Sequence, residues 1–145
     1  MKGGRNAGGD RNNGRRGWLA AVALGVVCLA GGANFLGLSP TESAVIERTN
    51  AARAQRGLPP LQIDASLMNG ARNHARWMAG SRNLAHGGGV AENIAMGQIS
   101  AGEAVSSWMN SSGHRANILD GGHTRIGVAV AYSSNGTPYW CQQFR

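Results

Sequence analysis

The chain has 145 residues and a formal net charge of +7, although only 14% of its residues are charged. Residues 1–33 contain five basic side chains against the single acid Asp10, so this short segment carries more than half of the net charge. The remaining basic residues are scattered, with no basic run and no interleaved aromatic residues, which argues against nucleic-acid binding. Residues 39–145 are enough for one small domain with a modest core.

Residues 1–38 differ in composition from the rest and are predicted to lie outside the domain. Residues 1–17 are rich in Gly, Asn and Arg, and disorder is expected there. An uncharged apolar run, residues 18–38, follows this basic flank, which is typical of a signal sequence or a membrane anchor. Arg15-Arg16 also fits a twin-arginine export signal. Either form of leader places residues 39–145 outside the cytoplasm, secreted, periplasmic or anchored, with membrane contact only through this segment.

Two cysteines, Cys28 and Cys141, do not make a disulfide framework, because Cys28 belongs to the apolar leader. Cys141 is expected to behave as a small buried apolar residue.

Capping signals predict four helices. Ser39-Pro40-Thr41-Glu42 combines a capping residue, a proline at the first helical position and a returning glutamate, and Gly57 supplies a stop. Similar signals, with apolar spacing, open the later helices. The expected ranges are 40–56 capped by Ser39, 65–79 capped by Asp64, 101–109 opened by a Ser100–Glu103 capping box, and 113–119 capped by Ser112.

A β-hairpin is predicted at the C-terminus. Residues 126–132 are rich in β-formers, Asn135-Gly136 is a hairpin signal, and residues 139–144 pair back. A short strand is also expected near residues 93–96. Helices followed by a hairpin indicate an α+β fold in which helices pack on a small antiparallel sheet. Three tryptophans are expected in the core: Trp77, Trp108 and Trp140.

Three polar residues are candidates for a shared site. His86 and Glu92 are six residues apart across a run of glycines, and His114 follows Glu92 by 22 residues. Imidazole and carboxylate groups bind zinc-like ions or move protons. The spacing alone is a weak signal, since the sequence has no His-Glu-x-x-His helix.

Structural roles are the alternative interpretation of these residues and their neighbours. Glu92 would then bond backbone N–H groups and lock its loop, and Asn93 and Asn117 would brace turns and caps. His74 falls on the core side of its helix and is expected to be packed with a local hydrogen bond. Arg115 is interpreted as a surface charge, and His123 as exposed and without a role.

Several motifs together resemble the bacterial branch of the CAP superfamily, the cysteine-rich secretory, antigen 5 and pathogenesis-related proteins, also called SCP-like domains. The most specific is the Trp-Met-Asn-Ser-Ser-Gly-His-Arg-Ala-Asn-Ile-Leu run. The resemblance covers about residues 42–144, and the segments that carry it are 50–53, 57–61, 71–79, 91–95, 108–119 and 126–128.

The resemblance implies an α-β-α sandwich with an open cleft, which in many relatives holds two histidines and two glutamates and in some binds a divalent cation. By position, His86 and His114 match the two histidines, and Glu92 matches the glutamate of a Gly-Glu-Asn motif, here with Ala91 in place of glycine. Ser111 stands where the second glutamate is found, which would weaken a metal site. The stretch between His86 and Glu92 is shorter than usual for the branch, so a more open cleft is expected.

We therefore expect His86, Glu92 and His114 to share a site able to take Zn²⁺ or another divalent cation, with Ser111 at the cleft and water completing the coordination. His114 would lie at the start of a short helix, whose positive dipole end disfavours the imidazolium and keeps a ring nitrogen available.

Three functions are compatible with these features. The first is an exported binding module for a divalent cation, a small apolar ligand or an envelope component. The second is a metal-assisted hydrolase acting on peptide or cell-wall substrates, and the third is a structural envelope protein. The first is preferred, because the second cleft acid is missing and no nucleophile is evidently paired with a base. Ser111 and Ser112 near His114 leave a Ser–His pair conceivable.

Overall fold

The structure is a computed structural model that describes residues 37–145. The predicted leader therefore lies, up to residue 36, outside the described residues, and so does Cys28. Within residues 37–145 the structure contains no helix with the length and apolar character needed to span a membrane. Leu38, the last residue of the predicted apolar run, is partly buried and packs against the core.

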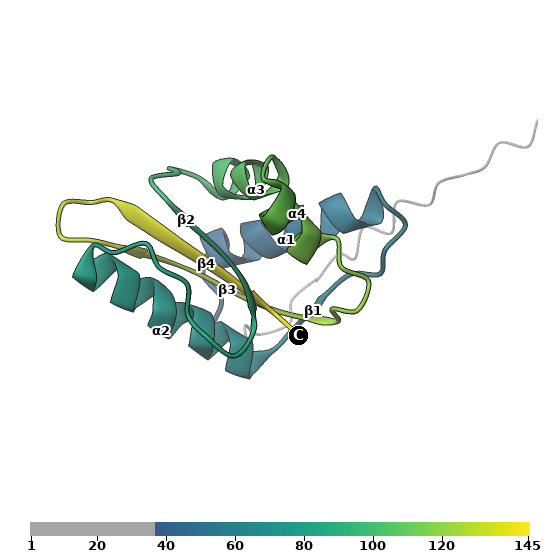
Figure 1. The fold of residues 1–145 in the computed structure, drawn as a ribbon, viewed down its shortest axis with the longest axis horizontal. Coiled ribbons are helices and arrows are strands. Elements are labelled where there is room, and N and C mark those ends of the chain that lie inside the picture. Colours follow the sequence, from purple (N-terminus) through teal and green to yellow (C-terminus); the bar gives the residue numbers. More distant parts are fainter. Residues whose placement is uncertain (1–36) are drawn as a thin grey trace, which may run out of the picture. The chain divides into compact units, whose positions relative to one another are not determined.

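Four helices and four strands make up the domain (Figure 1). In chain order they are α1 (Pro40–Ala54), β1 (Gln62–Ile63), α2 (Ala65–Ser81), β2 (Ala91–Met96), α3 (Ala101–Met109), α4 (Ser112–Ile118), β3 (Arg125–Tyr132) and β4 (Pro138–Phe144).

The capping predictions are confirmed at three helix starts, with two differences in detail. The Ser39–Glu42 capping box is complete, and Asp64 accepts a hydrogen bond from Leu67 N. Ser100 caps α3, but the Glu103 carboxylate accepts from Ile99 N instead of returning to Ser100. The prediction that Ser112 caps α4 was wrong by one residue. Ser112 is the first residue of the helix, and Ser111, which precedes it, makes no side-chain capping bond.

The sheet has the order β1-β3-β4-β2. The predicted hairpin is confirmed: β3 and β4 pair antiparallel, with Val130 opposite Trp140. The strand predicted near residues 93–96 is β2, which starts two residues earlier and pairs antiparallel with β4 at the sheet edge. The sheet is not wholly antiparallel, because the two-residue β1 pairs parallel with β3.

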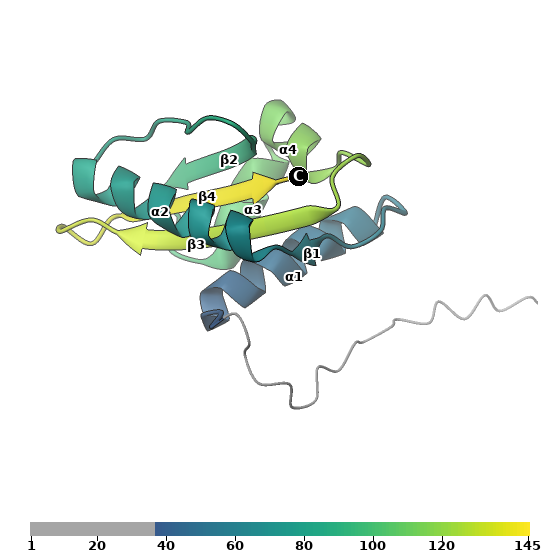
Figure 2. The same cartoon turned by 90° about the horizontal axis from the view of Figure 1, so that it is seen from below.

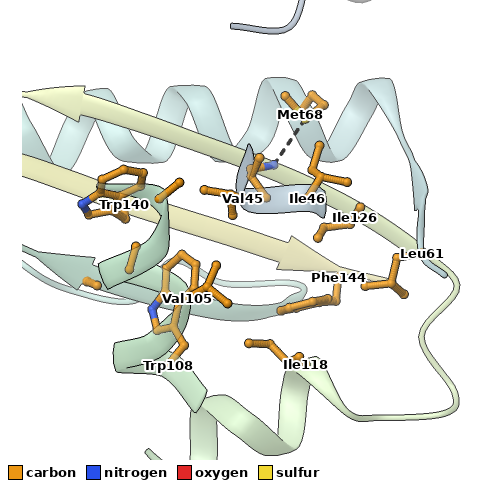
Figure 3. Close-up of a cluster of buried hydrophobic side chains, with 14 residues drawn as sticks. Val45, Ile46, Leu61, Met68, Val105, Trp108, Ile118, Ile126, Trp140 and Phe144 are labelled. Atoms are coloured by element: carbon orange, nitrogen blue, oxygen red, sulfur yellow. Dashed lines mark hydrogen bonds between the residues drawn. The ribbon is translucent and has the colours of Figure 1, made fainter. Parts of the chain in front are cut away.

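Helices cover both faces of the sheet, which confirms the predicted α-β-α sandwich. Helix α2 lies on one side of the strands, and α1, α3 and α4 lie on the other (Figures 1 and 2). The larger core fills the side of α1, α3 and α4 and includes Trp108, Trp140 and Phe144 (Figure 3). The smaller core, beneath α2, is built largely of small residues such as Ala71, Ala75 and Ala129, and Cys141 is buried in it as predicted.

Two predictions about ring side chains were wrong. Trp77 is 50% exposed, because Ala71, Ala75 and Met78 form the stripe of α2 that faces the sheet and Trp77 falls beside it, stacked on the His74 ring. His123 was expected to be exposed and idle, but its ring stacks on Phe144 with centroids 5.3 Å apart.

Arg53, in the last turn of α1, fixes the connection between α4 and β3. Its side chain is fully buried and donates to four backbone carbonyls, those of Pro59, Ile118, Asp120 and His123. A planar guanidinium with five donors can serve several acceptors at once, which a single ammonium cannot match in a fixed geometry. Because Ile118 ends α4, this contact also holds the helix that carries His114.

Helix α2 approaches the sheet most closely at Gly127 of β3. A Cβ atom added there would lie 2.1 Å from the Leu67 carbonyl carbon and 2.4 Å from Met68 N, so only glycine leaves room for the helix backbone. Beyond this close contact, α2 also packs over β4.

We predict that Gly127→Ala destabilises the domain by about 2–3 kcal/mol, because the added methyl group meets backbone atoms that cannot rotate away. Urea unfolding measures the change. Gly80→Ala is the matched control: Gly80 also lies in α2 but has no neighbour within 4 Å of an added Cβ, so this change should stabilise the domain, by up to about 1 kcal/mol. Equal stabilities of the two variants would contradict the contact.

Candidate functional site

Beneath α2, one residue from each of three neighbouring strands forms a row across the sheet. Gly127 of β3 is paired with Gln143 of β4, which is paired with Glu92 of β2. Residues of α2 one turn apart lie over this row: Leu67 over Gly127, Gly70 over Gln143, and His74 beside Glu92. We call Gly127, Gln143 and Glu92 the sheet row; it ends at the edge strand where the candidate site begins.

The Glu92 carboxylate is buried, with only 4% of its side chain exposed, and the protein itself supplies its donors. Oε1 accepts from Gly87 N at 2.9 Å and lies 3.2 Å from His86 Nδ1. Oε2 accepts from Gln143 Nε2 at 3.0 Å and from the Cys141 thiol at 3.4 Å. The prediction that Glu92 bonds backbone N–H and locks the glycine loop is therefore confirmed at Gly87.

These donors keep Glu92 ionised. Burial alone raises the pKa of Glu92, but hydrogen bonds from Gln143, Gly87 and Cys141 and the charge of His74 outweigh burial and leave the pKa below its usual value. Burial, followed by the charge of Glu92 and the hydrogen bond to it, raises the pKa of the Cys141 thiol, so this thiol stays protonated and acts as a donor.

Glu92 also fixes the tautomer of His86. An ionised carboxylate can only accept, so Nδ1 of His86 carries the proton at the 3.2 Å contact. In the form of the ring that carries one proton, the lone pair is therefore on Nε2, directed away from Glu92. The side chain of His86 is 57% exposed, so this nitrogen is accessible from solvent.

His114, in the first turn of α4, brings the second predicted imidazole to the same place. Its ring centroid is 6.4 Å from that of His86, and the two ring planes are tilted by 45°. Burial, with a smaller contribution from the charge of His86, lowers the pKa of His114. The direction of this shift agrees with the one expected from sequence, and burial and the charge of His86 are its causes here.

His74 is a third imidazole next to this group, and it was not among the candidate site residues. Its Nε2 lies 2.9 Å from Ala85 O and 3.6 Å from Glu92 Oε1, and since a carbonyl only accepts, Nε2 carries the proton. The hydrogen bond expected for His74 is therefore present and ties down the loop that carries His86. The sequence signal was available, because His74 lies seven residues after Leu67 on the helix face that meets the sheet.

The opposite face of β2 holds α4 in place. The buried Asn93 side chain donates to His114 O at 3.0 Å and to Gln142 Oε1 at 3.1 Å. Asn117 Nδ2 donates to Asn93 Oδ1 at 2.9 Å and also to Glu92 O. The predicted bracing roles of Asn93 and Asn117 are thus confirmed, and the brace fixes the backbone of His114.

Ser111 lies beside this group in sequence without joining it by a polar contact. Its carbonyl accepts from Arg115 N at 2.8 Å. Across residues 37–145, no hydrogen bond links the Ser111 side chain to His86, Glu92 or His114. Arg115, predicted to be a surface charge, is exposed and donates to Met109 O.

Residues 37–145 contain no group of three or more His, Cys, Asp and Glu side chains arranged to hold a metal ion. Because both oxygens of Glu92 face protein donors, this carboxylate orients His86 and is not free to be the third ligand predicted from sequence. What the site offers is two imidazoles.

A separate hollow of about 470 Å³ lies away from the histidines. Within it Arg72 makes a two-bond ion pair with Glu42, both contacts measuring 2.8 Å. Its lining residues are Gly37, Ser39, Glu42, Arg72, Arg76 and Val130.

The arrangement places the chain among the α-β-α sandwich proteins, with two histidines beside the edge strand β2. The model of the cysteine-rich secretory protein family, CAP, matches residues 46–144, and the chain belongs to this family.

One curated relative is similar in sequence, and solved structures share the fold. The protein YkwD of Bacillus subtilis is 39% identical over 125 residues, a match that covers 74% of this chain and 48% of YkwD. This chain thus spans about half the length of that relative. An extracellular protein with an SCP domain from Bacillus anthracis has a TM-score of 0.61 at 23% identity, covering 74% of this chain and 44% of that one. NaASP2, solved with Zn²⁺, has a TM-score of 0.61 at 16% identity over 74% of this chain and 80% of its own.

The lowered pKa of Glu92 leads to a prediction about acid stability. Because the pKa of Glu92 is lower in the folded than in the unfolded protein, its ionisation stabilises the fold. This stabilisation is complete above the pKa of a glutamate in the unfolded chain, about 4.3, and is lost as pH falls through the lower pKa of the folded protein. Glu92→Gln should therefore lower the free energy of unfolding by about 1–3 kcal/mol at pH 7. This gap between the variant and the wild type should shrink as pH falls below about 4.

Urea unfolding of both proteins from pH 7 to pH 3 measures the gap. Glu47→Gln, on an exposed position of α1, serves as the control and should leave the pH profile unchanged. A gap for Glu92→Gln that is the same at pH 7 and pH 3 would count against an ionised, hydrogen-bonded Glu92.

Proposed function

We propose that this domain is an exported binding module whose site takes a divalent cation between His86 and His114. The observation that carries the proposal is the 3.2 Å contact between His86 Nδ1 and Glu92, which leaves Nε2 of an exposed ring facing away from Glu92 beside a second imidazole. Of the ligands compatible with the sequence, a divalent cation is the one for which the site presents matching donors.

The two rings are close enough to share one ion after a small movement. For a tetrahedral ion with metal–nitrogen bonds of about 2.0–2.1 Å, the centroids of two ligating imidazoles lie roughly 5 Å apart. The observed separation of 6.4 Å is larger, so the two rings must move closer together to bind the same ion. The lowered pKa of His114 supports the proposal, because only a neutral imidazole can bind metal.

Glu92 acts in this proposal through His86. Metal-binding histidines commonly donate their other ring N–H to a carboxylate, which sets the tautomer and makes the ligating nitrogen more basic. Glu92 occupies that position, and its burial and internal donors hold it there. Two protein ligands make a weaker site than three or four, and water is expected to complete the coordination.

Binding is favoured over hydrolysis. When bound, a cation at this site would act as a Lewis acid and lower the pKa of a coordinated water. Turnover also requires a group placed to move protons, and the ionised Glu92 is already committed to internal donors. The hydroxyl of Ser111 makes no capping contact and lies next to α4 without an orienting partner in the described part of the chain.

The exported location rests on two supports. The sequence predicts a signal or anchor before residue 39, and the Bacillus anthracis relative is described as extracellular. The Zn²⁺ present with NaASP2 supports a cation as ligand for the fold, and an envelope component remains a candidate partner of the surrounding surface.

Zinc titration of the purified domain tests the proposal. We predict one equivalent bound at pH 7.5, with affinity reduced at least tenfold in His86→Ala and in His114→Ala, because each change removes one of two ligands. Binding should weaken below about pH 6, where imidazoles are protonated. Isothermal titration calorimetry measures both effects.

His123→Asn is the matched control, because it removes an imidazole that lies in the loop before β3 and stacks on Phe144 of β4, not on His86 or His114. It should leave zinc affinity unchanged. Unchanged affinity in both site variants would overturn the proposal, and zinc-dependent peptide hydrolysis that is lost in His114→Ala would favour the hydrolase instead.

A further inference from the structure

Gln143 and Gly70 are residue types that normally lower the stability of a protein at the positions they occupy. Gln143 is buried, at 8% exposure, among the mostly apolar residues beneath α2, where an amide costs free energy unless it is hydrogen-bonded. Gly70 lies in the interior of α2, where glycine is less favourable than alanine by about 0.5–1 kcal/mol. The two residues are in contact across the helix–sheet interface.

The contact explains both residues at once. A Cβ on Gly70 would lie 2.5 Å from Gln143 Oε1, so any larger residue at position 70 displaces the amide from the place it occupies beneath the helix. In that position Gln143 Nε2 donates to Glu92 Oε2 at 3.0 Å. The orientation of the amide is chemically determined, because an ionised carboxylate accepts and only the nitrogen of the amide can donate to it.

The hydrogen bonds to Glu92 Oε2 determine where Glu92 Oε1 lies. Gln143 and Cys141 hold Oε2 toward the interior, and this leaves Oε1 facing the loop with Gly87 N and His86 Nδ1. Without the Gln143 donor, only the Cys141 thiol holds Oε2 and only Gly87 N holds Oε1 from the protein interior, so the orientation of the carboxylate opposite His86 is less restricted. Cys141 cannot replace it, since a thiol is a weak donor.

We infer that Gln143, with the space provided by Gly70, is a positioning residue that fixes the tautomer of His86 through Glu92 and so sets the cation affinity of the site. Gln143 does not touch the cation; its effect passes through two hydrogen bonds. The effect on cation affinity rests on the proposed function. The effect on the tautomer of His86 does not, because the ring has a tautomer in the metal-free protein as well.

Two substitutions disturb the same amide in different ways. Gln143→Leu removes the donor while keeping a side chain of similar shape, and Gly70→Ala keeps the donor but pushes the amide out of place. Gly70→Ala also improves helix propensity, so a folded variant is available if Gln143→Leu does not fold. Gly80→Ala is the matched control on the same helix, with no neighbour within 4 Å.

The first measurement is the ring tautomer of His86 in metal-free protein, read from ¹⁵N chemical shifts and long-range ¹H–¹⁵N couplings. The wild type and Gly80→Ala should show the proton on Nδ1. Gln143→Leu and Gly70→Ala should both show a substantial Nε2–H population. The double variant should show no larger change than Gln143→Leu, because both substitutions act through one amide. A residue that only filled space would leave the tautomer unchanged, and that result in both single variants overturns the inference.

The second measurement is zinc affinity of the same proteins. Both variants should bind Zn²⁺ about tenfold more weakly than the wild type, the usual effect of losing an outer-shell partner. If the wild type does not bind zinc but the tautomer shifts, the proposed function fails and the positioning role stands. If zinc binding depends on His86 but both variants match the wild type in affinity and tautomer, the positioning role fails and the proposed function stands.

Discussion

The close approach of α2 to the sheet is the constraint on which the candidate site depends. At Gly127 the helix backbone comes so near the strand that no side chain fits between them. This contact sets the height of the following turn, where Gly70 lies over Gln143, and of the next, where His74 comes within 3.6 Å of Glu92. A larger residue in the first position would lift the helix, and the polar contacts beyond it would lengthen together.

The second constraint is the alternation of side chains along β2. Because successive residues of a strand point to opposite faces, Glu92 faces α2 while Asn93 faces α4. Glu92 orients His86 on one side, and Asn93 holds the backbone of His114 on the other. Two adjacent residues of an edge strand thereby bring together imidazoles that lie 28 residues apart in the chain. Such an edge is also where both layers of a sandwich can be reached from solvent.

The sequence predicted what depends on local chemistry and missed what depends on register. Caps such as Ser39 and Asp64, the hairpin and the α-β-α class follow from short-range signals and from the family resemblance. The pairing of Gln143 with Glu92 was not predictable, because the partner of a strand residue is set by how the whole sheet aligns. Trp77 was misplaced for a similar reason: small residues beside it fill the helix–sheet interface and leave its ring outside.

The state of Glu92 also bears on what kind of site this is. A carboxylate used as a proton carrier needs a pKa near the working pH, and burial alone shifts the pKa of Glu92 upward, in that direction. Instead the donors on Oε1 and Oε2 hold the pKa of Glu92 below its usual value, so at neutral pH the group is a fixed negative charge. A fixed charge is well suited to holding one proton on His86 Nδ1 and poorly suited to exchanging protons with a substrate. Under the proposed function, this arrangement favours the use of Glu92 to orient His86 as a ligand for a cation.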